Sequence, residues 1–237
     1  MRLDKFLAQN GFGTRSEVKE LIKKGKITIN QNIVKSPDLK VNENDSVMVE
    51  GIPVKNTGTV YYMLNKPSGV VSATRDNTDK TVIELLEEKG IVTKDLFPVG
   101  RLDKDTEGLL ILTQDGILAH NLLSPKKHVS KTYFVKCLNV FTEEMKNDLT
   151  TGVDIGDEKK TLPAEINILN PHEIELTICE GRFHQVKRML HAVNNEVTYL
   201  KRISMGNVLL DENLAPGEFR MLTESEIETL KNNNRKS

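Results

Sequence analysis

One polar turn, residues 97–110 (FPVGRLDKDTEGLL), constrains the local fold of this chain more than any other segment. Gly100 and Gly108 flank it, and glycine allows tight backbone turns that strain other residues. Asp103 lies between them, close to the start of an apolar run. A carboxylate held in such a turn can act as a nucleophile or a general base. A helix N-cap or an ordinary turn aspartate is the commoner explanation of a single Asp, so the rest of the chain has to decide.

The composition is typical of a globular protein without a membrane segment. The 237 residues suffice for one large domain, or for a medium domain and a small one. No apolar stretch approaches the length that spans a bilayer, and the N-terminus lacks the apolar core of a signal peptide. Cys137 and Cys179 have no zinc or redox spacing, so we expect two buried thiols in a reducing compartment. These features predict a cytoplasmic protein.

Charge is distributed unevenly along the chain. The formal net charge of −1 argues by itself against a nucleic-acid partner. Basic residues nevertheless gather in three segments, residues 15–26, 126–136 and 182–202, whereas the acidic residues concentrate elsewhere. Such segregation indicates a localised binding face of the kind that nucleic-acid-binding proteins use.

Two short helices are expected at the N-terminus. An apolar stripe begins at Leu3, and a turn at residues 11–13 separates it from the next helix. Thr14 and Glu17 form a capping box, which predicts a second helix over about residues 15–24 with a basic exposed face.

Short strands and a linker are expected next. Alternating polar and apolar residues predict three strands, at residues 26–30, 33–35 and 46–50. Residues 51–58 contain Gly, Pro and Asn and little to bury, which is typical of a linker. We therefore assign residues 1–50 to a small first domain and residues 59–237 to a larger second domain.

The small domain resembles the S4 (α-L) RNA-binding domain. The resemblance rests on residues 1–7 (MRLDKFL), the helix start at residues 14–16 (TRS) and residues 25–30 (GKITIN). An Asn-Gln-Asn turn replaces the Asn-Gly hairpin turn that is common in these domains. The resemblance implies that basic side chains of this domain bind RNA phosphates, namely Arg2, Arg15, Lys19, Lys23 and Lys24. A merely solvated charged helix is the alternative.

The second domain is expected to be α+β, with a mixed or antiparallel sheet and flanking helices. Strands are predicted at residues 60–65, 109–113 and 131–138, and as an antiparallel pair at 164–168 and 173–178. Helices are predicted at residues 82–88, 142–149, 183–193 and 225–232. Neither βαβ alternation nor a phosphate loop is present in the sequence.

Four segments of the second domain occur in the order and spacing of the pseudouridine synthases. They are residues 64–72 (LNKPSGVVS), 97–110, 131–135 (KTYFV) and 180–190 (EGRFHQVKRML), followed by residues 200–202 (LKR). Over essentially the whole chain they resemble the RsuA/RluB-type ribosomal RNA branch, whose members carry an N-terminal S4 domain. Gly-Arg-Leu-Asp alone would occur by chance, but the combination is highly specific.

The resemblance implies isomerisation of uridine to pseudouridine without a cofactor. The glycosidic bond is broken, the uracil turns within the site, and C5 is joined to the ribose, while a nucleophilic carboxylate holds the intermediate. Asp103 takes this role, attacking C1′ of the ribose or C6 of the base, or supporting a glycal route. Lys187 takes the place of the cation beside the carboxylate, and Tyr133 that of the tyrosine that stacks on the target base. As ordinary alternatives, Lys187 would be a solvated helix lysine and Tyr133 a half-buried strand tyrosine.

The same resemblance implies that further residues bind RNA. Leu200 lines the pocket, unless it is a plain core leucine, and Arg101 fills the gap left by a flipped uridine or holds a phosphate. We expect a phosphate-binding rim of further basic residues, namely Lys66, Arg182, Arg188, Lys201 and Arg202. His184 is better explained as a surface histidine, and Asp105 as a turn or helix-start residue.

Ribosomal RNA is the expected partner, with 16S rRNA of the small subunit favoured. Large-subunit relatives with an S4 domain tend to carry a basic C-terminal extension, whereas this chain stops soon after Arg220. The alternatives are the same chemistry on 23S rRNA and a non-catalytic S4 assembly factor, against which the intact Asp103, Tyr133 and Lys187 argue. The RNA would be free or in a partly assembled subunit. We expect a monomer without metal or membrane association.

Overall fold

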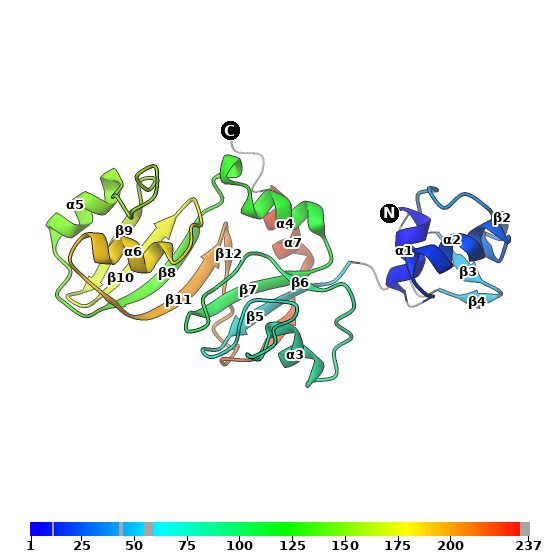
Figure 1. Cartoon of the computed structure of the whole chain (residues 1–237), viewed down its shortest axis with the longest axis horizontal. Helices are drawn as coiled ribbons and strands as arrows, with labels where there is room; N and C mark the ends of the chain where they lie inside the picture. Colours follow the sequence, from blue (N-terminus) through cyan, green and yellow to red (C-terminus); the bar gives the residue numbers. More distant parts are fainter. Residues whose placement is uncertain (11, 43–44, 55–58, 233–237) are drawn as a thin grey trace. The chain divides into compact units, whose positions relative to one another are not determined.

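The computed structural model describes residues 1–10, 12–42, 45–54 and 59–232. The chain divides into two compact units, Met1–Val60 and Tyr61–Ser237 (Figure 1). Each unit has its own sheet and its own cluster of buried apolar side chains.

The first unit begins with two helices, α1 (Leu3–Gln9) and α2 (Arg15–Lys23). The capping box is present, because the Thr14 hydroxyl accepts from the Glu17 amide and the Glu17 carboxylate accepts from the Thr14 amide at 2.7 Å. These bonds satisfy amide groups that the first helical turn leaves unpaired. The buried side of α2 is apolar, and its basic side chains are exposed as the sequence predicts.

Four antiparallel strands complete the first unit in the order β2-β1-β3-β4. They are β1 (Ile27–Ile29), β2 (Asn32–Val34), β3 (Val47–Val49) and β4 (Ile52–Pro53). The predicted start of the linker, at residue 51, is wrong. Ile52 and Pro53 pair with β3, and Val54 is buried in the core of this unit. The rest of that segment, residues 55–58, lies outside the described residues.

The second unit contains one mixed sheet in the order β13-β5-β7-β11-β8-β10-β9, with β12 on β11 and β6 on β7. The strands are β5 (Tyr61–Lys66), β6 (Phe97–Pro98), β7 (Glu107–Thr113), β8 (Lys131–Cys137), β9 (Glu165–Asn170), β10 (Glu173–Ile178), β11 (Val197–Met205), β12 (Val208–Leu209) and β13 (Phe219–Met221). The β7–β11 pair is parallel and the other described pairs are antiparallel. The predicted mixed sheet and the β9–β10 hairpin are confirmed.

The helices of the second unit are α3 (Val82–Glu87), α4 (Gly116–Leu123), α5 (Glu143–Thr151), α6 (Gln185–Ala192) and α7 (Glu224–Asn232), with a short 3-10 turn at Pro125–Lys127. The helix α4 was not predicted from the sequence. The Asp115 carboxylate caps it by accepting from the amides of Ile117 and Leu118, both at 3.0 Å. No helix in the described part of the chain is both long and apolar enough to cross a bilayer.

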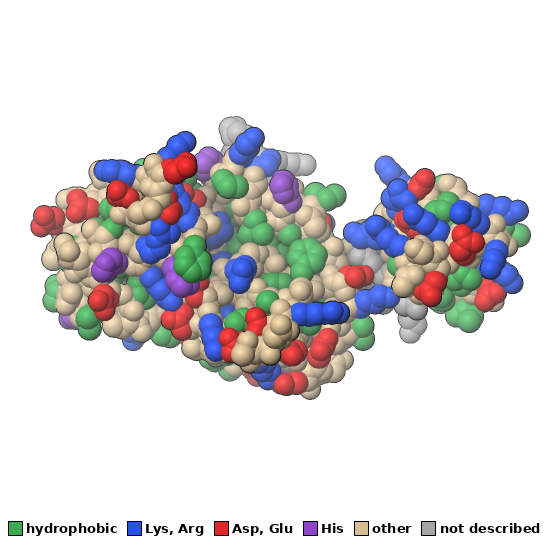
Figure 2. Space-filling view, viewed as in Figure 1, with side chains coloured by type: hydrophobic (Ala, Val, Ile, Leu, Met, Phe, Trp, Pro, Cys, Tyr) green, Lys and Arg blue, Asp and Glu red, His purple; other side chains and the backbone are tan. Residues whose placement is uncertain are grey.

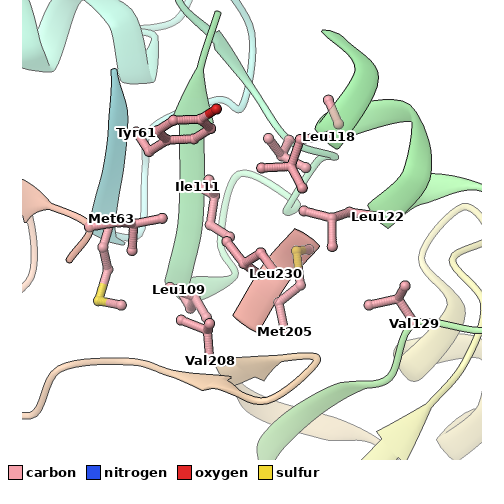
Figure 3. Close-up of a cluster of buried hydrophobic side chains, with 13 residues drawn as sticks. Tyr61, Met63, Leu109, Ile111, Leu118, Leu122, Val129, Met205, Val208 and Leu230 are labelled. Carbon is pink, nitrogen blue, oxygen red and sulfur yellow. The ribbon is translucent and has the colours of Figure 1, made fainter. Parts of the chain in front are cut away.

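A buried cluster fixes β7, the strand that follows the Asp103 turn. Leu109 and Ile111 of β7 face Leu118 of α4 and Leu230 of α7, with Met63 of β5 beside them (Figure 3). Burying an aliphatic side chain of this size contributes about 1.5–3 kcal/mol. The start of β7 is therefore a rigid base for the turn.

Candidate active site

The segment after β5 anchors the turn that carries Asp103. The Ser72 hydroxyl accepts from the Leu102 amide and donates to the Leu102 carbonyl, both at 3.0 Å. The Gly69 amide donates to the Lys104 carbonyl at 2.8 Å. The backbone is thus fixed on both sides of Asp103, whose side chain is 26% exposed.

Lys66 does not lie on a phosphate-binding rim, contrary to our expectation. It is fully buried, and its Nζ donates to the carbonyls of Pro67, Lys104 and Thr106 at 3.0, 3.2 and 2.8 Å. Burial lowers the pKa of Lys66 to about 8, against the opposing effect of nearby carboxylates. The ammonium therefore stabilises the turn from beneath and is too deep to reach a phosphate.

Two carboxylates of the turn share one lysine of α6. The Nζ of Lys187 lies 3.3 Å from Asp103 Oδ2, and 2.6 and 2.8 Å from the two carboxylate oxygens of Asp105. Burial alone would lower the pKa of Lys187, but the hydrogen bond to Asp105 and the two negative charges outweigh it and raise the pKa. The same hydrogen bond lowers the pKa of Asp105. Asp105, expected to be only a turn residue, is the nearer partner of Lys187.

His184 also reaches Asp103, although we expected a surface histidine. Its Nε2 lies 3.6 Å from Asp103 Oδ1, and its backbone is left-handed, with φ of 47°, directly before α6. The ring of Phe183 stacks on the imidazole, with 3.8 Å between centroids and 19° between planes. The spacing of three residues between His184 and Lys187 was a usable signal, because residues three apart lie on one side of a helical turn.

Tyr133 and Arg202 lie in one row across the sheet. Tyr133 is opposite Arg202 of β11, which is in turn paired with Gly108 of β7. Gly108 has φ of +100°, and a Cβ there would lie 2.2 Å from the Arg202 carbonyl oxygen, so glycine permits this close approach. Tyr133 and Leu200 are buried. Within the described residues, Tyr133 makes no hydrogen bond with Asp103.

Arg202 is buried and does not belong to an exposed rim, which corrects a second expectation. Its Nε donates to the Leu109 carbonyl at 2.8 Å, and its Nη2 has no partner within the described part of the chain. Burial and the neighbouring Arg202 charge together lower the pKa of Lys131 to about 8. A guanidinium at this depth supports the sheet and cannot bind a phosphate at the surface.

Arg182 and Arg188 hold a loop of the protein. Both contact the Asp157 carboxylate, from Arg182 Nη1 at 3.3 Å and from Arg188 Nη2 at 2.6 Å. Arg182 also donates to the carbonyls of Lys159 and Lys160 at 2.6 and 2.8 Å. These bonds occupy donors that a phosphate would need, so neither side chain is free in the way expected for a rim.

Arg101 is the expected substrate-binding arginine that remains exposed. It lies two residues before Asp103 and makes no ion pair or hydrogen bond with any described residue. Lys201, which precedes Arg202 on β11, lines a shallow hollow with Phe134 and Tyr199. Figure 2 shows Lys and Arg side chains gathered over the area that α6 occupies in Figure 1.

The basic side chains of the first unit fall into two groups. The exposed group lies on α2 and its C-cap and consists of Arg15, Lys19, Lys23 and Lys24. Arg2 instead donates to the Asp4 carboxylate at 2.9 and 3.1 Å and contacts Asp38, so its charge is largely neutralised within the protein. Figure 2 shows Lys and Arg side chains on the face that α1 and α2 form in Figure 1.

The arrangement at the turn has the chemistry of a paired carboxylate. Asp103 is partly exposed, its backbone is anchored, and a lysine and a histidine flank its two oxygens. Such a carboxylate can attack an electrophilic carbon or accept a proton. Among the described residues, no group of three His, Cys, Asp or Glu side chains could hold a metal ion.

Comparison with known proteins gives a consistent assignment. Residues 60–192 match the family described as RNA pseudouridylate synthase, and residues 1–47 match the S4 domain. The chain is 50% identical over 235 residues to an uncharacterized RNA pseudouridine synthase of Bacillus subtilis (strain 168), covering 97% of this chain and 98% of that protein.

It is also 41% identical over 229 residues to the ribosomal small subunit pseudouridine synthase A of Escherichia coli (strain K12), covering 96% of this chain and 98% of that protein. A crystal structure of a pseudouridylate synthase matches with a TM-score of 0.69 and 39% identity, covering 97% of this chain and 99% of that one. This chain belongs to the RNA pseudouridylate synthase family.

Proposed function

We propose that this chain converts one uridine of 16S ribosomal RNA to pseudouridine. The choice of RNA is supported by 41% identity to a ribosomal small subunit pseudouridine synthase A across nearly its whole length. The observation that carries the catalytic part is the 3.3 Å contact between Asp103 and Lys187 on an anchored turn. We further propose that the protein acts as a monomer in the cytoplasm, on free RNA or on a partly assembled subunit.

The proposed reaction needs no second reactant. The N1–C1′ bond of uridine breaks, a C5–C1′ bond forms, the proton on C5 is lost and N1 gains one, so the composition of the nucleotide is unchanged. Asp103 acts as the nucleophile at C1′ or C6, or supports a glycal route. All three routes require an ionised carboxylate that is shielded and held beside the reacting ring.

The surrounding residues have distinct roles in this proposal. Lys187 provides the positive charge beside Asp103, and Asp105 holds the Lys187 ammonium in place. Tyr133 and Leu200 line the pocket for the flipped uracil. Arg101, exposed two residues before Asp103, fills the space that the flipped nucleotide leaves or binds a phosphate.

The S4 unit supplies affinity for the RNA backbone in this proposal. The supporting observation is the exposed basic face of α2, made of Arg15, Lys19, Lys23 and Lys24. Lysine and arginine contacts of this kind position a protein on RNA without reading its sequence.

Mapping pseudouridine in both ribosomal RNAs of a strain that lacks this protein tests the choice of RNA. We expect one site to be lost from 16S rRNA and restored by the wild-type gene but not by Asp103→Asn. Loss confined to 23S rRNA would contradict the 16S assignment while retaining the chemistry. An unchanged pattern in both RNAs would favour a non-catalytic RNA-binding role. Purified protein with 16S transcript and with small-subunit assembly particles distinguishes free RNA from a partly assembled substrate.

A further inference from the structure

An aromatic ring stands in solvent at the edge of the proposed active site. Phe183 is 75% exposed, and among the Phe and Tyr residues that the structure describes it is the only exposed one. A phenylalanine in this position does not contribute the burial energy that such a side chain normally gives to folding. Its exposure therefore indicates that the ring contacts a binding partner.

The backbone around Phe183 is held rigidly. Its carbonyl accepts from Arg188 Nη1 at 3.1 Å. On its other side, the Arg182 amide donates to Gln185 Oε1 at 2.9 Å, and the Gln185 amide donates to the Arg182 carbonyl at 3.2 Å. One face of the ring already rests on the imidazole of His184. A ring fixed in this way loses little conformational freedom when a ligand covers its other face.

The position of the ring relative to Asp103 suggests what covers it. The His184 imidazole lies between them, with Nε2 3.6 Å from Asp103 Oδ1 and its centroid 3.8 Å from that of Phe183. The Phe183 ring is thus separated from the Asp103 carboxylate by one stacked ring, the His184 imidazole. Positive charge is present at the same site, because Lys187 Nζ lies 3.3 Å from Asp103 Oδ2 and the exposed Arg101 is two residues before Asp103 in the turn.

We propose that Phe183 stacks on an unpaired RNA base next to the flipped uridine, with His184 supporting the ring from below. RNA-binding proteins commonly bind splayed bases on aromatic side chains. The proposal rests on the RNA-modifying function proposed above and adds a positioning residue for a neighbouring nucleotide. A base in this stack is held at a fixed distance from Asp103, which helps to place the target.

A fluorescence measurement tests the stacking directly, because the chain contains no tryptophan. Phe183→Trp introduces a single indole at this position, and Leu169→Trp introduces one at a 46% exposed site on the edge strand β9 as a control. Both are made in the Asp103→Asn background and titrated with a 16S rRNA transcript. We expect quenching of the indole emission in the first protein and little change in the second. Equal emission with and without saturating RNA in the first protein would overturn the proposal.

Kinetics distinguish a stacking role from a structural one. Phe183→Ala should raise KM for the RNA on the order of 5- to 150-fold, the range for losing one base–aromatic stack, with a smaller effect on kcat at saturating RNA. Phe183→Tyr should restore KM, whereas Phe183→Leu, which is apolar but has no ring, should not. If the wild-type protein forms pseudouridine in this assay and Phe183→Ala has an unchanged KM, the stacking role is contradicted and the proposed function is not. If the wild-type protein forms no pseudouridine, the proposed function fails instead, and the fluorescence titration still tests the stack.

Discussion

Replacing Lys66 by methionine tests whether a buried ammonium anchors the catalytic turn. The Nζ of Lys66 donates three hydrogen bonds to carbonyls, two of them in the turn itself. Hydrogen bonds to a charged group contribute about 1.5–3 kcal/mol each, and the lowered pKa corresponds to a cost of about 3 kcal/mol for burying the charge. We therefore expect Lys66→Met to lower the free energy of unfolding by about 2–5 kcal/mol at pH 7 and to reduce kcat.

The pH dependence of this difference gives a sharper test. The pKa of Lys66 is about 8 in the folded protein, against an ordinary value of 10.5. Between these values the unfolded chain binds more protons than the folded one, so the contribution of Lys66 to stability rises with pH. From pH 7 to 9.5 the wild type should gain about 2 kcal/mol relative to Lys66→Met. Lys131, whose pKa is also about 8, is present in both proteins, so its effect cancels.

Urea unfolding at pH 7 and 9.5, followed by circular dichroism, measures both quantities. Lys104→Met is the matched control, because this lysine belongs to the same turn but its side chain is 53% exposed and pairs with Asp79. Such a surface pair contributes about 0.2–1 kcal/mol, and we expect no widening of the difference with pH. A Lys66→Met protein as stable as the wild type, or a stability difference that narrows as pH rises, would refute the reasoning.

Two further predictions concern the cation at the site and the S4 unit. Lys187→Met should lower kcat on the order of 10- to 150-fold, because a charge-assisted contact of about 1.5–3 kcal/mol with Asp103 is lost. Lys187→Arg should recover much of the lost rate. Single-turnover assays measure the rates of both variants, and an unaffected kcat in Lys187→Met would contradict the pairing. Lys19→Glu combined with Lys23→Glu should weaken RNA binding most strongly at low salt and make the affinity less dependent on salt, because phosphate contacts are lost, while kcat at saturating RNA stays unchanged. Filter binding across a salt series measures this, and unaltered affinity at low salt would exclude this face.

Features that depend on neighbouring residues in the sequence were predicted well. The capping box at Thr14 and Glu17 and the β9–β10 hairpin follow from local hydrogen bonding and alternation, and both are present. The start of the linker was wrong because Ile52 and Pro53 acquire their strand only by pairing with β3. That pairing brings in a partner that local composition does not reveal.

The longest strand of the second unit, β11, and the helix α4 were among the elements not predicted, each for a physical reason. The inward face of β11 carries Arg202 and Ser204 among its buried residues, so the strand shows no simple alternation of polar and apolar side chains. In α4 the apolar residues do not form a clear stripe, and the Asp115-Gly116 pair that caps the helix has the composition of a strand-ending turn. Both elements form because the surrounding sheet buries them.

The site residues likewise divide into those that the sequence predicts and those whose surroundings depend on distant parts of the chain. The proximity of Lys187 to the Asp103 turn could be anticipated, because the motif places them in the matching segments. The burial of Lys66 could not, since its carbonyl partners lie up to 40 residues away in the chain. Asp105 was predicted to be only a turn residue because that is the usual role of an aspartate at such a position. Its partner Lys187 lies 82 residues further along the chain, so the local sequence does not reveal the contact.

Asp103→Asn is the most direct test of the central claim that this carboxylate carries the isomerisation. The substitution keeps the size of the side chain and removes its charge. We predict that pseudouridine formation in the 16S rRNA transcript, measured under single-turnover conditions, is abolished, while affinity for the same RNA stays within about threefold of wild type, since the phosphate contacts are unaffected. Turnover near the wild-type rate would contradict the assignment of Asp103 as the catalytic carboxylate.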